Sequence, residues 1–255
     1  MIIETCSVTA VREAGDGIFV LAFTSASLSS TLRPGQFLNI RTEEGIEPLL
    51  RRPFSAYRVS GTTVEIIFHV IGRGTSALST KRPGDTLDVL GPLGVPFATG
   101  GGEYDTAVLI AGGLGVAPLP ILTASLRKAG KQIVTLLGGR TAKVVVGDHL
   151  EELQCATDDG SMGFHGTVVD LARNTLAKQP PRRPKIFSCG PTPMLKAVAE
   201  YASSAGIPCE VSLEGAMGCG FGICQGCPVE LTGEPLRYAL MCKDGPVFDT
   251  RTIRF

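Results

Sequence analysis

TAVLIAGGLGVAPLPILTASLRKAG, residues 106–130, joins three kinds of segment in a fixed order. Its first part is a continuous apolar run with the length and composition of a buried strand, ending near Ile110 or Ala111. A glycine-rich turn follows, and the remainder has the apolar periodicity of a helix. A buried strand that leads through a turn into a helix predicts a parallel sheet with helices on its faces.

The segments that follow repeat this plan. QIVTLLGGR at residues 132–140 predicts a second buried strand. Residues 185–206 again read as strand, turn and helix, and residues 208–214 supply one more strand. We therefore predict an α/β domain with a parallel sheet over residues 103–212.

The first hundred residues follow a different pattern, in which short apolar runs alternate with turn signals. Runs of this kind occupy residues 17–23, 35–41, 63–71 and 85–94. They are rich in valine, isoleucine and phenylalanine, and glycine or proline bounds them, as expected for the strands of a small β-barrel. The glycine-rich stretch 98–105 marks a composition break, so we place the barrel domain at residues 1–98.

The last forty residues hold a cluster of cysteines. GCGFGICQGC at residues 218–227 contains Cys219, Cys224 and Cys227, and Cys242 follows after fourteen more residues. Disulfides, a zinc site and an iron–sulfur cluster are the three candidates. The N-terminus lacks the features of a signal peptide, which predicts a cytoplasmic protein. In a reducing cytosol such clusters are more often metal sites than disulfides, so zinc and iron–sulfur remain.

Composition excludes two further classes of function. The 255 residues include 24 basic and 24 acidic side chains, so no net positive charge is available for binding nucleic acid. The longest apolar stretch, residues 107–122, is interrupted by glycines and prolines. We therefore expect no membrane-spanning segment.

Two turns at the ends of predicted parallel strands suggest a nucleotide site. Glycines let the backbone turn sharply and point unpaired helix amides at a phosphate. Ligands of open α/β sheets bind beyond the carboxyl ends of the strands, where both turns lie. We therefore predict a nicotinamide nucleotide site formed by Gly112, Gly113, Gly115, Cys189, Gly190 and Pro191.

The barrel segment contains two further motifs that suit phosphates. In RRPFS, residues 51–55, Arg52 can pair with phosphate oxygens, Phe54 offers a packing face and Ser55 a hydroxyl. GRGTSALS, residues 72–79, predicts a second glycine-rich turn that leads into a helix. Two phosphate-directed elements in one small barrel suit a dinucleotide such as FAD.

Taken together, RPFS, the Gly72-x-Gly74-Thr75 turn, GGLGVAP and CGP resemble the ferredoxin–NADP reductase superfamily in their order and spacing. The C-terminal EGAMGCGFGICQGCPVEL and YALMCKDGPVF resemble the electron transfer subunits of class 1B dihydroorotate dehydrogenases, and this likeness covers essentially the whole chain. The resemblance implies a Greek-key barrel for FAD, a central NAD-binding α/β domain and a small [2Fe–2S] module over residues 213–255.

The resemblance also implies the cofactor ligands. Those for FAD would be Arg52, Pro53, Phe54, Ser55, Ile67, Phe68, His69, Gly74 and Thr75. Those for one [2Fe–2S] cluster would be Cys219, Cys224, Cys227 and Cys242. The Cys-x4-Cys-x2-Cys spacing is typical of plant-type [2Fe–2S] ligation, whereas structural zinc sites usually pair two compact Cys-x2–4-Cys units. The chain departs from its relatives at Phe54 and His69, where they often carry an aliphatic residue and a tyrosine or arginine.

The function that the resemblance implies is electron transfer between NAD, FAD and the cluster. Dihydroorotate would be oxidised on a separate FMN-containing catalytic subunit, in a heterotetramer that reduces NAD+ during pyrimidine biosynthesis. Two alternatives stay open: the small subunit of another NAD(P)H complex, such as a bifurcating transhydrogenase or a hydrogenase, and a zinc-stabilised binding module. The likeness favours NAD over NADP, although Arg140 and Lys143 follow the second parallel strand, where a 2′-phosphate would lie.

Overall fold

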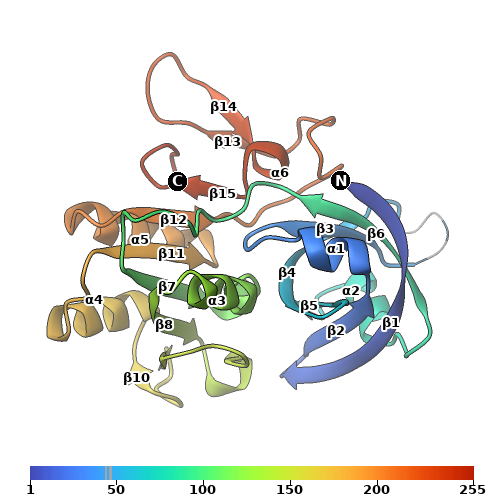
Figure 1. The fold of residues 1–255 in the computed structure, drawn as a ribbon, viewed down its shortest axis with the longest axis horizontal. Helices are drawn as coiled ribbons and strands as arrows, with labels where there is room; N and C mark the ends of the chain where they lie inside the picture. The colour runs from blue at the N-terminus through green and yellow to red at the C-terminus, as the bar shows by residue number, and fades with distance from the viewer. Residues whose placement is uncertain (44, 46–47) are drawn as a thin grey trace.

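The computed structural model describes residues 1–43, 45 and 48–255. Figure 1 shows a barrel beside a sheet flanked by helices, with the cysteine-bearing C-terminal segment lying across both. In the described part of the chain, no helix has the length and apolar character needed to cross a membrane.

The barrel is closed and antiparallel, with strands in the order β1-β2-β5-β4-β3-β6. The strands are β1 (Ile2–Gly15), β2 (Ile18–Thr24), β3 (Phe37–Arg41), β4 (Arg52–Ser60), β5 (Thr63–His69) and β6 (Thr86–Leu93). The chain leaves β2, crosses to β3, and returns through β4 to place β5 beside β2, which is a Greek-key path. Two short helices, α1 (Ala26–Thr31) and α2 (Arg73–Ser79), accompany it, and the predicted barrel is confirmed.

Strand β3 is buried on both of its faces. Leu38 and Ile40 point into the barrel and belong to its core. Phe37 and Asn39, the alternate residues, face outward and are nevertheless buried. The outer face of β3 is therefore covered by another part of the chain, which proves to be the C-terminal segment.

The second sheet contains seven strands in the order β10-β9-β8-β7-β11-β12-β15. They are β7 (Thr106–Gly112), β8 (Gln132–Gly139), β9 (Leu153–Thr157), β10 (Phe164–His165), β11 (Pro184–Cys189), β12 (Cys209–Ser212) and β15 (Val247–Asp249). All neighbouring pairs are parallel except β12 and β15. The predicted parallel sheet is confirmed; β9 and β10 lie in a segment for which no strand was predicted.

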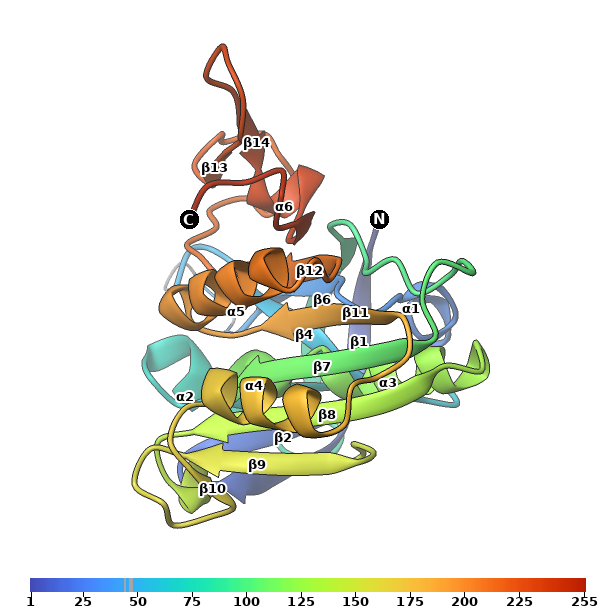
Figure 2. The same ribbon diagram turned by 90° about the vertical axis from the view of Figure 1, so that its left-hand side faces the viewer.

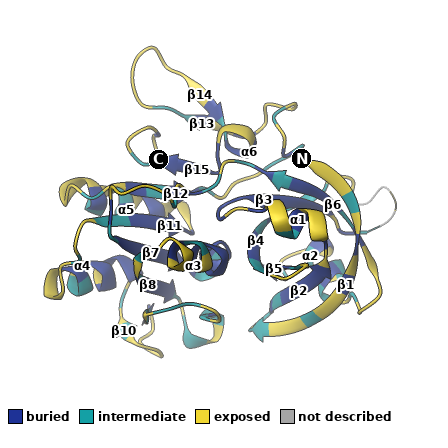
Figure 3. Cartoon of the chain, in the orientation of Figure 1, coloured by how far each residue is buried: buried dark blue, intermediate teal, exposed yellow. Residues whose placement is uncertain are grey.

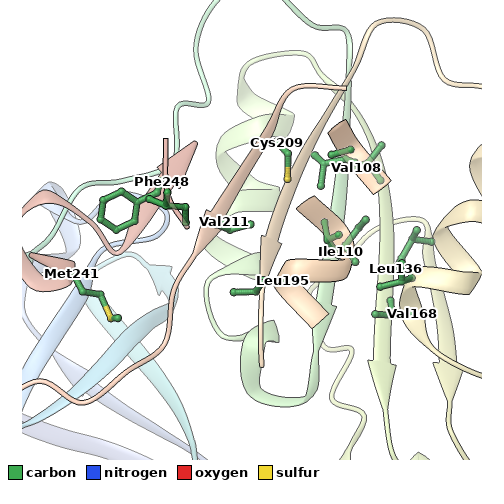
Figure 4. Close-up of a cluster of buried hydrophobic side chains, with 14 of the residues drawn as sticks. Val108, Ile110, Leu136, Val168, Leu195, Cys209, Val211, Met241 and Phe248 are labelled. Carbon is green, nitrogen blue, oxygen red and sulfur yellow. The ribbon is translucent and has the colours of Figure 1, made fainter. Parts of the chain in front are cut away.

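Helices cover both faces of this sheet. The helices are α3 (Leu119–Lys128), α4 (Val168–Lys178) and α5 (Thr192–Ser204). Helices α4 and α5 pack on one face, where Val108 and Ile110 of β7 join the core drawn in Figure 4. Leu109 points to the other face, toward α3 and outward-facing residues of the barrel strands. Helix α3 therefore lies between the sheet and the barrel.

The C-terminal segment leaves the sheet after β12 and returns to it. It forms a hairpin of β13 (Pro228–Glu230) and β14 (Tyr238–Leu240) and a short helix, α6 (Met241–Asp244), before β15 pairs with β12. Much of the cysteine loop and the hairpin tip is exposed, whereas α6 and β15 have buried residues (Figure 3). The segment is thus anchored to the sheet at both ends, and its predicted boundary at residue 213 stays a prediction.

Candidate functional site

A cleft of about 560 Å³ lies between the barrel and the C-terminal segment. The barrel wall consists of β4, β5 and the start of α2. From these elements come most of the predicted FAD residues, namely Pro53, Phe54, Ser55, Ile67, Phe68, His69 and Thr75. The structure thus brings together residues from three separate motifs at one cleft.

The cleft also has lining residues that were not among the predicted FAD ligands. The further lining residues are Phe37, Ile71, Leu114, Ala117, Ser212, Leu213, Glu214, Gly215, Met217 and Pro246. Leu114 and Ala117 lie in the predicted glycine-rich turn. Ser212 ends the parallel strand β12 and residues 213–217 follow it, so the rule that ligands bind beyond strand carboxyl ends would have indicated them. No comparable local signal marks Pro246.

The cleft has an apolar, aromatic wall with a few polar groups. Phe54 and Phe68 meet edge to face with ring centroids 5.8 Å apart, and Phe68 stacks against Phe19 at 6.2 Å. Ser55 and Thr75, which carry hydroxyls, also line the cleft. A mostly apolar cleft with a small number of placed hydroxyls suits a flat aromatic ligand such as a flavin ring.

Arg52 and Gly74 lie near one another but do not line the cleft. The Nη1 atom of Arg52 donates to the Leu50 carbonyl oxygen at 2.8 Å. A Cβ atom on Gly74 would lie 3.6 Å from the Arg52 Cγ and 3.2 Å from the Thr42 Oγ1. The neighbouring Thr75 Oγ1 accepts from the Ile71 amide at 3.0 Å, which holds the turn before α2. A phosphate contact by Arg52 stays a prediction.

The two glycine-rich turns of the sheet touch each other through their backbones. Strands β7 and β11 are neighbours, with Ala111 opposite Cys189. A Cβ atom on Gly115 would lie only 2.1 Å from the Cys189 carbonyl oxygen, so glycine is required for this approach. A Cβ atom on Gly190 would lie 3.1 Å from the Gly112 amide nitrogen. The predicted nucleotide-binding residues therefore lie together at the carboxyl ends of β7 and β11.

Cys189 connects this edge to the cleft. Its side chain is 1% exposed, and its Sγ lies 3.8 Å from the Glu214 Oε1, which lines the cleft. Burial, together with the Glu214 carboxylate, raises the pKa of the Cys189 thiol well above its usual value. Glu214 is itself exposed, and partial desolvation raises the pKa of its carboxyl group. The thiol therefore keeps its proton and can donate it to the carboxylate in a weak hydrogen bond.

The four C-terminal cysteines form two pairs. The Cys224 amide donates to the Cys219 Sγ at 3.4 Å, and the sulfurs of Cys227 and Cys242 lie 3.2 Å apart. Two pairs of thiols suit a cluster of two irons with four cysteine ligands better than one tetrahedral zinc.

The loop also favours the thiolate form of its first cysteine. Burial raises the pKa of Cys219, but the amide N–H groups of Cys224, Phe221 and Ile223 outweigh this effect and lower the pKa to about 6. Burial and the adjacent Cys227 raise the pKa of Cys242 to about 12. Thiolate is the form that binds iron, and amide donors around sulfur are typical of iron–sulfur sites. The residues present therefore fit a [2Fe–2S] cluster.

The cleft and the cysteines are adjacent along the chain as well as in space. The lining stretch from Ser212 to Met217 continues into Cys219 within two residues. Pro246, another lining residue, stands four positions after Cys242. Both ends of the cysteine segment therefore form part of the cleft wall.

Comparisons with known proteins agree with this geometry. Residues 214–254 match the model of the iron–sulfur cluster binding domain of dihydroorotate dehydrogenase B. The chain is 36% identical over 252 residues to the dihydroorotate dehydrogenase B (NAD(+)) electron transfer subunit of Geobacillus kaustophilus, with 96% of each chain covered. It is 37% identical over 255 residues to the subunit of that name from Geobacillus thermodenitrificans, again with 96% of each covered.

A solved structure gives a similar result. The protein studied for flavin-based electron bifurcation as the NADH-dependent reduced ferredoxin–NADP oxidoreductase superposes with a TM-score of 0.85 and 31% identity. The match covers 98% of this chain and 89% of that one. Identity above one third over nearly the whole length of the two Geobacillus subunits decides the family. The chain belongs to the family of electron transfer subunits of dihydroorotate dehydrogenase B.

Proposed function

We propose that this chain carries electrons between NAD, FAD and a [2Fe–2S] cluster, and so couples dihydroorotate oxidation on a partner subunit to NAD+ reduction. One observation carries the proposal above the others. The wall of the predicted flavin cleft runs directly into the predicted cluster ligands, with Met217 two residues before Cys219. Such a cleft serves a chain whose two redox groups exchange electrons.

Each redox group would be held by residues described above. FAD, when bound, links the two-electron chemistry of a nicotinamide to the one-electron chemistry of an iron–sulfur cluster. Phe54 and Phe68 give the cleft an apolar wall that excludes water from the flavin ring. Arg52 and the turn at Thr75 would bind the phosphates of FAD, because a guanidinium and turn amides are good phosphate donors.

The nucleotide would bind at the paired glycine turns. Gly115 packs closely on Cys189 at the carboxyl edge of β7 and β11, which is where ligands bind in open α/β sheets. The Cys189 thiol retains its proton on Sγ beside the Glu214 carboxylate. These two side chains would place a polar pair where the nicotinamide meets the cleft.

The partner would dock beside the cysteine loop. Cys224 is exposed, and its neighbours Phe221 and Ile223 are 37% and 76% exposed. Exposed apolar side chains beside a redox site are typical of a protein interface. We propose that an FMN-containing catalytic subunit covers this face in a cytoplasmic heterotetramer.

A second candidate function has one specific observation in its favour. The bifurcation protein described above is 31% identical to this chain over nearly its whole length, which supports a role in another NAD(P)H-dependent complex as the second candidate. The identity to the dihydroorotate dehydrogenase subunits is higher, and the family model of their cluster domain matches residues 214–254. Dihydroorotate therefore remains the favoured source of electrons.

The test is spectroscopic and then biochemical. The protein purified without oxygen should show flavin and cluster absorption, contain iron, and lose both sets of bands when NADH is added. A colourless protein that contains zinc would refute the proposal. To separate the two candidate functions, the copurifying subunit is identified by mass and offered dihydroorotate. Reduction of this chain's flavin by dihydroorotate only in the presence of that subunit supports the first candidate, and no reduction supports the second.

A further inference from the structure

One side chain joins the barrel to the cysteine loop. Asn39 of β3 is 1% exposed, and its Nδ2 donates to the carbonyl oxygen of Cys219 at 2.9 Å. The donor is a barrel residue and the acceptor is the first predicted cluster ligand. A carbonyl oxygen can only accept, so the amide nitrogen of Asn39 must be the atom that faces it.

The loop is shaped for this contact. Gly220, the residue after Cys219, has a φ of +82°, in the left-handed region that favours glycine. A Cβ atom on Gly220 would lie 2.0 Å from the Asn39 Nδ2. Glycine at this position therefore satisfies two requirements at once, the backbone angle and the close approach of the asparagine.

Packing alone does not explain an asparagine at this position. The Asn39 Oδ1 is buried and has no hydrogen-bond partner in the part of the chain that the structure describes. A buried acceptor without a partner costs free energy, and an apolar side chain of the same size would avoid that cost. The single bond to Cys219 is what this asparagine provides.

The position of Asn39 on its strand gives the bond a consequence for the cleft. Phe37, two residues earlier on the same face of β3, lines the flavin cleft. Pro53, which is opposite Asn39 on β4, lines it as well. One strand therefore forms part of the cleft wall and also holds the loop of the cluster ligands.

We propose that Asn39 is a positioning residue, which clamps the Cys219 end of the cluster loop to β3 and so fixes where the cluster stands relative to the flavin. The bond lies at the start of the loop, and the Cys224 amide in turn donates to the Cys219 sulfur. Clamping Cys219 therefore positions the first pair of ligands. This inference rests on the proposed function, since it concerns the same two cofactors.

The experiment compares two substitutions that each remove one amide-to-carbonyl bond. Asn39→Leu removes the clamp with little change in size. Gln225→Met is the matched control, because the Gln225 Nε2 donates to the Gly222 carbonyl oxygen at 2.7 Å within the loop and not to the barrel. Hydrogen exchange over residues 218–227 is measured on iron-free protein, and electron transfer from flavin to cluster is followed by stopped flow on the loaded protein.

We expect Asn39→Leu to speed amide exchange over residues 219–224 roughly two- to tenfold, the loss of one hydrogen bond. It should also slow flavin-to-cluster transfer, while iron content and flavin reduction by NADH stay at wild-type values. Gln225→Met should loosen the loop without slowing that transfer. Wild-type exchange and transfer in Asn39→Leu would overturn the inference, as would equal slowing in both variants.

A second variant tests the same contact in case Asn39→Leu fails to fold. Gly220→Ala leaves Asn39 in place but pushes the loop away from it through the added Cβ, so it should reproduce the slowed transfer. Unchanged transfer in a folded, loaded Gly220→Ala protein would equally overturn the clamp. Failure of the proposed function is distinct, because wild-type protein would then lack flavin or cluster bands.

Discussion

Replacing Gly115 with alanine tests the nucleotide site through its tightest contact. The added Cβ would stand 2.1 Å from the Cys189 carbonyl oxygen and 2.6 Å from the Gly190 Cα. Both neighbours are backbone atoms on a buried strand end, so no side-chain rotation can relieve the clash. The two turns would have to separate until the first distance reaches at least 3.0 Å, a displacement on the order of 1 Å.

This displacement sets the size of the expected effect. Overpacking of a well-packed region costs about 1–3 kcal/mol, which lowers the melting temperature of a chain of this length by roughly 2–12 °C. A misplacement on the order of 1 Å at a reacting centre can cost up to about 100-fold in rate. We therefore expect much slower flavin reduction by NADH, with FAD content unchanged because the FAD motifs lie on the barrel.

The assay is anaerobic stopped-flow reduction of the flavin by NADH, together with thermal unfolding. Gly130→Ala is the control: Gly130 has a φ of +69°, and no atom lies within 4 Å of an added Cβ. The backbone strain in Gly130→Ala should lower the stability by about 1 kcal/mol. The rate of flavin reduction by NADH should not change. Wild-type reduction and melting in Gly115→Ala would refute the contact between the turns. Equal slowing in Gly130→Ala would show that lost stability, and not displacement of the turn, governs the rate.

Four further predictions concern single side chains. Arg52→Ala should lose FAD on gel filtration while the protein stays folded, because a bidentate phosphate contact is hard to replace. Full FAD occupancy in this variant would show that Arg52 is an ordinary surface residue. Cys189→Ser should keep the flavin and cluster spectra but slow reduction by NADH, and unchanged kinetics would leave Cys189 a core residue. Cys224→Ser should lose cluster absorbance and partner binding while NADH still reduces the flavin, because oxygen is a harder donor than thiolate; iron at the wild-type level would show the ligand assignment to be wrong. In iron-free protein, Cys219, whose pKa is lowered to about 6, should be thiolate and react with iodoacetamide at pH 7, whereas Cys242, whose pKa is raised to about 12, should stay protonated and unmodified. Equal rates of modification, measured by mass spectrometry, would contradict this difference.

Strands with continuous apolar patterns could be predicted from the sequence, and strands without them could not. Residues 107–111 are all apolar because both faces of β7 are buried, so β7 stands out. Most of β1 is exposed on its outer face and carries polar residues, so no apolar run marks it. Strand β9 is short and contains Gln154, and its place in the sheet depends on pairing with β8.

The residues of the site likewise fall into those that could be predicted from the sequence and those that could not. Residues within contiguous motifs, such as Ser55 and Thr75, could be assigned because turn chemistry and phosphate binding impose local patterns. Glu214 and Pro246 reach the cleft only because the C-terminal segment folds back over the barrel. Asn39 lies inside a predicted strand, and nothing in its neighbours along the chain indicates a contact with Cys219. Tertiary contacts of this kind produce no local sequence pattern from which they could be predicted.

The pairing of β15 with β12 has a consequence for the chain before it meets a partner. Open sheet edges invite pairing with other chains and so lead to aggregation. In the described residues, this sheet ends in the two-residue β10 on one side and the three-residue β15 on the other. Strands this short offer few unpaired amides to a second molecule. By returning to the sheet, the cysteine segment covers the edge of β12 and leaves only a short strand with which a second molecule could pair.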